Sequence, residues 1–162
     1  MQVKVYPPLM TESDLDPDLK KVIDVFKSKK VEIDSTTHKA HKHDVLDAVR
    51  GPLQDMGYEV RNGRTQRVQL PVTDNVQYDV DAYNSATSIA VDVEAGRARM
   101  NNAFLRDIVD VSLMADVDHL VLAVPIKWDI TCPFAGICDY LDAFYKNGRI
   151  SLPLKPIVII GY

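Results

Sequence analysis

The sequence predicts an α/β fold in which a central mixed β-sheet has helices on both faces. Two segments, 119–125 and 156–161, are almost continuously apolar, which is typical of strands that are buried on both sides. Between residues 58 and 94, apolar and polar residues alternate, which indicates antiparallel strands with one solvated face. The predicted order of helix, several strands, helix, strand, helix and strand gives a layered sheet of this kind.

The first half of the chain is predicted to contain an edge strand and two helices. Residues 1–8 form the edge strand, because prolines at its end are compatible only with an edge position. Asp16 followed by Pro17 is a typical helix start, with an N-cap and a proline at the first helical position. Residues 45–56 carry the apolar stripe of a second helix, and Pro52 within it predicts a kink or break.

Two more helices and a hairpin complete the predicted elements. The segments 99–116 and 133–147 have broad apolar stripes and should pack on the sheet as helices. Residues 58–61 and 65–72 flank Asn62-Gly63, and an Asn-Gly pair between alternating segments is the strongest short signal for a β-hairpin.

Acidic residues line one face of each of two predicted strands, 76–81 and 89–94. Side chains two residues apart on a strand point to the same face. If these two strands pair as an antiparallel hairpin, the pairing gathers up to four carboxylates, namely Asp79, Asp81, Asp92 and Glu94.

Carboxylates that lie so close repel one another unless a cation or a proton separates them. A divalent metal meets this need, and Mg²⁺ favours a few carboxylate oxygens. The alternative is a half-solvated hairpin with an acidic outer face, because alternation alone is common in antiparallel sheets. Two features favour the metal site: aspartate is a poor strand former, and the second strand leads into a helix.

Composition predicts one globular domain over residues 1–162 in the cytoplasm. The chain is 46% hydrophobic and 26% charged, and it has no apolar run near the ~20 residues that span a membrane. The start of the sequence lacks the apolar core of a signal peptide. The two cysteines, Cys132 and Cys138, do not make a disulfide framework or a CxxC metal motif.

The net charge of −4 argues against binding nucleic acid, but the charge is unevenly distributed. Residues 26–70 contain nine Lys and Arg against six Asp and Glu. If the chain binds DNA, we expect the phosphate contacts near the start of the second helix and around the Asn-Gly turn. The candidate residues are His41, Lys42, Arg61 and Arg64.

The ordered pattern Asp81 … Asp92-Val-Glu94 resembles the signature of PD-(D/E)xK nucleases, and specifically the BglII/BamHI-like branch of type II restriction endonucleases. In that branch Glu or Gln replaces the usual motif lysine. The resemblance covers roughly residues 40–162, which would form the nuclease core. Two departures matter. Asp92 is shorter than the usual glutamate, and a longer loop after Asp81 leaves open whether Asp79 or Asp81 is the first metal ligand.

The resemblance implies a restriction-endonuclease-like core and a metal-dependent endonuclease that cuts double-stranded DNA as a homodimer. By resemblance, Asp81, Asp92 and Glu94 are catalytic, and Mg²⁺, or Mn²⁺ in its place, is held by Asp81, Asp92, the Val93 carbonyl and Asp79. Glu94 would share the metal site or orient the attacking water. Because a carboxylate cannot supply the charge of a lysine, a second metal or a cation such as Arg97 or Arg99 would compensate; Arg97 is also a candidate DNA contact. The alternatives are a repair or structure-processing nuclease, and a binding protein with a decayed site.

Overall fold

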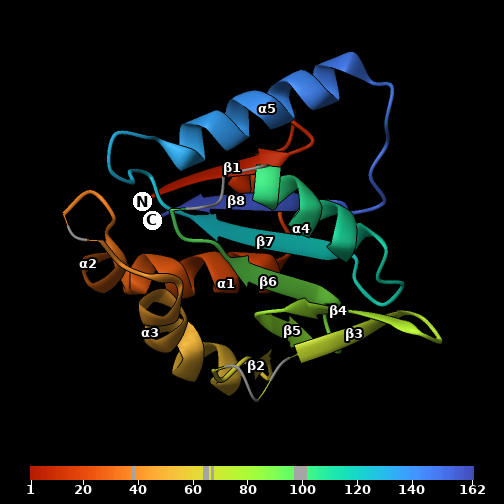
Figure 1. Ribbon diagram of the computed structural model, residues 1–162, viewed down its shortest axis with the longest axis horizontal. Helices are drawn as coiled ribbons and strands as arrows, with labels where there is room; N and C mark the ends of the chain where they lie inside the picture. The colour runs from red at the N-terminus through yellow and green to blue at the C-terminus, as the bar shows by residue number, and fades with distance from the viewer. Residues whose placement is uncertain (38, 64–65, 67, 97–101) are drawn as a thin grey trace.

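The centre of the protein is a mixed β-sheet. The computed structural model describes residues 1–37, 39–63, 66, 68–96 and 102–162, and these residues form a six-stranded sheet with the order β1-β8-β7-β6-β5-β2 (Figure 1). Its parallel core is buried almost throughout and consists of β6 (Ile89–Val93), β7 (His119–Val124) and β8 (Ile157–Gly161). The antiparallel strands at its sides are β1 (Gln2–Tyr6), β5 (Ala82–Asn84) and β2 (Glu59–Val60).

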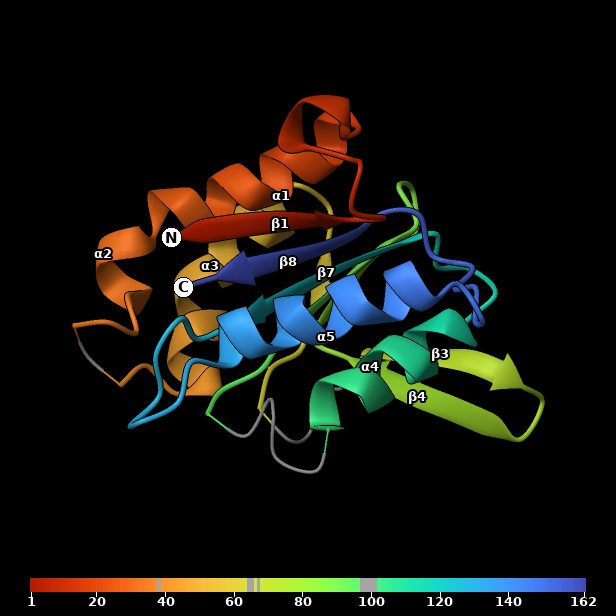
Figure 2. The same ribbon diagram turned by 90° about the horizontal axis from the view of Figure 1, so that it is seen from above.

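Helices cover both faces of this sheet, as the sequence predicts (Figures 1 and 2). One face packs against α1 (Pro17–Ser28) and α3 (Lys42–Asp55), and the short α2 (Lys30–Ile33) lies between these two in the chain. The other face packs against α4 (Ala103–Ser112) and α5 (Pro133–Asn147). A 3-10 turn, η1 (Glu12–Asp14), precedes α1.

The helix boundaries follow from local chemistry. Asp16 caps α1, because its Oδ1 accepts a hydrogen bond of 2.8 Å from the Asp18 amide, and Pro17 occupies the first helical position. Gly148 ends α5 with a φ of 66°, a conformation that favours glycine. None of the helices in the described ranges is long and apolar enough to cross a membrane.

Of the kink or break predicted at Pro52, the break is wrong. Helix α3 continues through Pro52 to Asp55. Val49 and Leu53 on either side of the proline are fully buried, and their packing holds the last helical turn although Pro52 cannot donate a backbone hydrogen bond.

The predicted pairing of residues 58–61 with 65–72 is also largely wrong. The Asn-Gly turn forms, but around it there is a single described bridge, between Asn62 and Gln66. Beyond the turn the two segments diverge. Strand β2 joins β5, whereas β3 (Val68–Thr73) pairs with β4 (Val76–Val80) in a separate two-stranded sheet.

The two acidic segments pair differently from the prediction. Strand β4 does not pair with β6; the chain bends at Asp81, and it is the following β5 that forms the antiparallel hairpin with β6. The register pairs Ala82 with Val91, which brings Asp81 opposite Asp92. Asp79 and Asp81 therefore do not share one face of a single strand, because the bend separates them.

Candidate active site at the carboxyl end of strand β6

Strand β6 carries two of the predicted site residues at its carboxyl end. Asp92 lies on the same face as Ala90, toward α4, and is only 7% exposed. Glu94 follows the strand directly, and its amide donates a hydrogen bond of 2.8 Å to the Ala123 carbonyl of β7. Because the end of a parallel strand is where α/β proteins place their sites, both carboxylates occupy a position suited to function.

Asp81 is locked to β6 by reciprocal hydrogen bonds. The Asp81 amide donates to Asp92 Oδ1 at 3.0 Å, and the Val93 amide donates to Asp81 Oδ2 at 2.9 Å. Asp81 is 1% exposed. The structure thus brings Asp81 and Asp92 together, as predicted. The resemblance makes the Val93 carbonyl a metal ligand; the contact of Val93 with Asp81 is made by the Val93 N–H.

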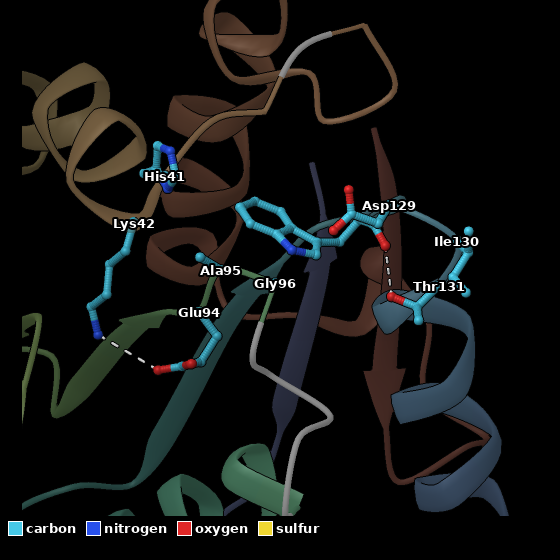
Figure 3. A pocket seen from close by; sticks show the side chains of 9 residues that line it. His41, Lys42, Glu94, Ala95, Gly96, Asp129, Ile130 and Thr131 are labelled. Atoms are coloured by element: carbon cyan, nitrogen blue, oxygen red, sulfur yellow. Dashed lines mark hydrogen bonds and ion pairs between the residues drawn. The ribbon is translucent and has the colours of Figure 1, made fainter.

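A lysine from a distant helix completes this group. Lys42 is the first residue of α3, and its Nζ lies 2.8 Å from Asp81 Oδ2. The same Nζ lies 3.6 Å from Glu94 Oε1 (Figure 3). The sequence identified Lys42 as a phosphate contact, but its amine points to the two carboxylates. The cations expected to compensate for Glu94, Arg97 and Arg99, lie outside the described residues.

Arg61 also points inward. Its Nη1 lies 3.7 Å from Asp81 Oδ1, its Nε donates to the Gly63 carbonyl at 3.1 Å, and its amide donates to the Asp81 carbonyl at 2.7 Å. The structure therefore places Arg61 beside the buried Asp81, at the rim of the site. Arg64, the other arginine predicted near this turn, lies outside the described residues, and His41 caps the start of α3 on the surface.

The charges of this group perturb one another. Burial, reinforced by the Asp81 carboxylate, raises the pKa of Asp92 well above its usual value. Burial also raises the pKa of Glu94, although Lys42 opposes the change. Burial by itself lowers the pKa of Lys42, but the carboxylates of Asp81, Asp92 and Glu94 outweigh it and raise that pKa. Strongly shifted groups that cluster in a cleft are characteristic of functional sites.

Asp107 of α4 is a further acidic residue that the sequence reasoning missed. Burial, together with the charge of Glu94, raises its pKa to about 7. Its Oδ2 is buried and has no hydrogen-bond partner among the described residues. A signal existed in the sequence, because Asp107 stands at helical spacing within the apolar stripe formed by Phe104, Ile108 and Val111.

Two clefts have lining residues at this end of β6, Asp92 in one and Glu94 in the other. The first, which we call the acidic cleft, has a volume of about 530 Å³, and its charged lining consists of Asp79, Asp92, Arg106, Asp107 and Asp110. Asp79, the alternative first ligand, accepts a hydrogen bond of 2.9 Å from Gln69 Nε2 there. Both candidates for the first metal ligand therefore lie near Asp92. Asp79 shares the acidic cleft with Asp92, whereas Asp81 is hydrogen-bonded to Asp92 and ion-paired with Lys42.

The second cleft, which we call the aromatic cleft, has a volume of about 670 Å³. Lys42 and Glu94 form part of one wall (Figure 3). The other lining residues are His41, Ala95, Gly96, Trp128, Asp129, Ile130 and Thr131.

The donor atoms of the site fit a hard cation such as Mg²⁺. They are carboxylate oxygens, and Asp81 Oδ1 is a buried atom with no hydrogen-bond partner among the described residues. In the described ranges, however, no three His, Cys, Asp or Glu side chains are grouped as a ready metal site. The physical reason is visible at Lys42, whose ammonium already lies between Asp81 and Glu94.

Comparisons with known proteins leave the family open. No protein-family model matches the chain, and no curated protein gives a significant match.

Proposed function

We propose that this chain is a metal-dependent endonuclease that hydrolyses phosphodiester bonds in DNA, and that it belongs to the PD-(D/E)xK nucleases in their restriction-endonuclease-like branch. One observation carries the proposal. At the end of β6, Lys42 Nζ stands 2.8 Å from Asp81 and 3.6 Å from Glu94. A lysine from α3 thus joins the acidic residues whose sequence pattern lacks the usual motif lysine.

Phosphodiester hydrolysis needs an activated water and neutralisation of charge on the phosphate. Asp81 and Asp92, with help from Glu94 and Asp107, would hold the metal. When bound, Mg²⁺ supplies a Lewis acid for the phosphate oxygens and promotes the ionisation of water. Mn²⁺, with the same preference for oxygen ligands, is the natural substitute.

The residues of the chain have separate tasks in this mechanism. The reciprocal hydrogen bonds between Asp81 and β6 fix the two buried carboxylates relative to each other. Lys42 places a positive charge where charge develops on a phosphate oxygen, which is a large contribution when the donor is preorganised. Glu94, which lies beside Lys42 directly after strand β6, would orient the attacking water.

Double-stranded DNA is the proposed substrate, and a homodimer is the proposed state, since two copies of such a site can cut both strands. One observation favours a second candidate, a non-catalytic binding protein. In the structure, Lys42 already compensates the carboxylates that would hold the metal. If the protein is non-catalytic, Lys42 occupies permanently the position that a metal would take in an active site, and its ion pairs with Asp81 and Glu94 stabilise the fold.

Cleavage of supercoiled plasmid DNA in Mg²⁺ tests the proposal. We expect the wild type to nick or linearise the plasmid, and Asp92→Asn to lose at least 100-fold in rate because a metal ligand is neutralised. Asp24→Asn, a matched change at an exposed position of α1, should cleave like the wild type. Tight binding of DNA by the wild type without any cleavage would favour the non-catalytic candidate.

A further inference from the structure

The aromatic cleft has a feature that the proposed hydrolysis does not use, the indole of Trp128. Trp128 lies in the loop after β7, where its amide donates to the Thr131 carbonyl at 2.9 Å and its carbonyl accepts from the Thr131 amide at 2.9 Å. This two-way bridge and the positive φ of 51° at Asp129 make the loop tight. The indole is therefore presented by a well-defined turn.

The main chain after β6 packs directly on this indole. A Cβ at Gly96 would lie 1.9 Å from Trp128 Nε1 and Cε2, so only glycine allows this approach. The His41 ring meets the indole edge-on, with a centroid distance of 5.8 Å and an interplanar angle of 73°. Trp128 is thus held between the end of β6 and the start of α3.

Groups that attract phosphate surround the same indole. Lys39 Nζ lies 5.6 Å from the centroid of the Trp128 ring and pairs with Asp129. The 14-residue helix α3 begins at Lys42, so its positive dipole end faces the cleft beside His41. An aromatic platform next to positive groups is the combination by which proteins bind single-stranded nucleic acid.

The platform and the candidate catalytic residues share one cavity. Lys42, Glu94 and Trp128 all line the aromatic cleft, whose volume of about 670 Å³ is typical of cavities that bind a ligand larger than a single phosphate. In a duplex both faces of a base are stacked on neighbouring bases, so an indole can stack only on a base that has left the helix or was never paired.

We propose that the aromatic cleft binds an unpaired nucleotide adjacent to the cleaved phosphate, with its base stacked on Trp128. The substrate then contains a single-stranded segment, such as an overhang, a flap or a mismatch, at the point of cleavage. The position of the scissile phosphate rests on the proposed nuclease function, whereas stacking on Trp128 does not. This inference replaces the fully paired duplex that the resemblance implies with DNA that carries an unpaired nucleotide at the cleaved position.

Trp128 is the only tryptophan in the chain, so its fluorescence reports directly on this cleft. The wild type is titrated, without divalent metal, with a thymidine oligonucleotide of about 12 nucleotides, within the usual range of single-strand sites. We expect single strands to quench the emission and a blunt duplex of equal length to leave it unchanged. No quenching by the single strand, or equal quenching by the duplex, overturns the proposal.

Variants test whether the indole contributes to binding, with fluorescence anisotropy of a labelled oligonucleotide as the readout. Trp128→Leu should weaken single-strand binding roughly tenfold, whereas Trp128→Phe should retain most of the affinity because it keeps an aromatic face. Tyr140→Leu removes an exposed aromatic on α5 and should bind like the wild type. Equal affinity of Trp128→Leu and wild type contradicts the proposal.

The two proposals fail separately. Quenching by single strands together with inactivity on every DNA substrate removes the nuclease function and leaves the stacking site intact. If the protein cleaves plasmid DNA but single strands do not change its tryptophan emission, the stacking site is ruled out and the nuclease function is retained.

Discussion

The two clefts at the end of β6 differ in how their charges are arranged. In the aromatic cleft, each carboxylate of the lining has a lysine beside it: Glu94 has Lys42 at 3.6 Å, and Asp129 has Lys39. In the acidic cleft, four aspartates line the cavity with one arginine, Arg106, whose Nε lies 3.8 Å from Asp110 Oδ2. Among the described residues that line the two clefts, aspartates thus outnumber basic residues four to one in the acidic cleft, whereas each carboxylate of the aromatic cleft has a lysine beside it.

The pKa values follow this division only in part, because burial also raises the pKa of Glu94 in the aromatic cleft. On the acidic side, burial raises the pKa of Asp92, Asp107 and Asp110. On the aromatic side, the surrounding carboxylates raise the pKa of Lys42 against the effect of burial. Carboxylates that resist ionisation gain most from a divalent cation, whereas a lysine that stays charged can meet a phosphate. On the proposed function, metal would bind on the acidic side and nucleic acid on the aromatic side.

Removing the lysine between the two sides should have the largest effect. Lys42→Met leaves the Asp81 carboxylate, which is 1% exposed, without its cation. We expect the free energy of unfolding to fall by about 3 kcal/mol and cleavage to fall at least 100-fold. Urea denaturation and the plasmid assay measure these effects. Lys146→Met on the surface of α5 is the matched control and should change neither.

A gain in stability after Lys42→Met would instead show that the ion pair costs more than it contributes.

Asp107 should make the metal-free protein less stable as the pH rises. Its pKa in the folded state, about 7, lies above the usual 3.8, so the folded state favours the protonated acid. This contribution is complete below pH ~3.8, declines as the pH rises toward 7, and is lost above it. Asp107→Asn should flatten the decline and gain ~2 kcal/mol at pH 8, after allowance for partial exposure.

Thermal or urea unfolding between pH 4 and 8 measures the slope for both proteins. Parallel stability curves for the wild type and Asp107→Asn would mean that Asp107 titrates normally.

Gly96→Ala should damage the aromatic cleft alone. The new Cβ would lie 1.9 Å from the Trp128 ring, so the indole must move. We expect a loss of about 1–2 kcal/mol in stability from this overpacking, a shift in tryptophan emission and weaker quenching by single strands. The response of the acidic cleft to Mn²⁺ should persist, since its lining does not include Gly96. Unchanged emission and quenching would show that Trp128 is not held as described.

Strong local patterns predicted much of the fold. The apolar runs at 119–125 and 156–161 became β7 and β8, and the predicted N-cap at Asp16 begins α1. Pairing between strands was predicted less well, because alternation identifies a strand but not its partner. The bend at Asp81, which divides β4 from β5, carries no such signal.

The candidate site was also predicted only in part, because local spacing can be read from the sequence and long-range packing cannot. Asp81, Asp92 and Glu94 were found because their spacing on strands is local, and the structure brings them together. The ion pairs of Lys42 depend on the packing of α3 against the sheet, which no spacing in the sequence encodes. Asp107 was missed although it interrupts an apolar stripe, a pattern that marks a polar group turned toward the core.

The response of stability to Mn²⁺ tests the central claim most directly, that the carboxylates at the end of β6 hold a divalent cation. Thermal melts of the wild type and of Asp92→Asn are compared with and without Mn²⁺. Without metal the variant should be as stable as the wild type or slightly more so, since the amide carries no charge that burial and Asp81 disfavour, while its Oδ1 can still accept the Asp81 amide.

With Mn²⁺ at about 100 times its dissociation constant, the wild type should gain about 2.7 kcal/mol, or roughly 5–10 °C in melting temperature. The variant should gain much less. Equal shifts in the two proteins, or no shift in the wild type, would contradict the account.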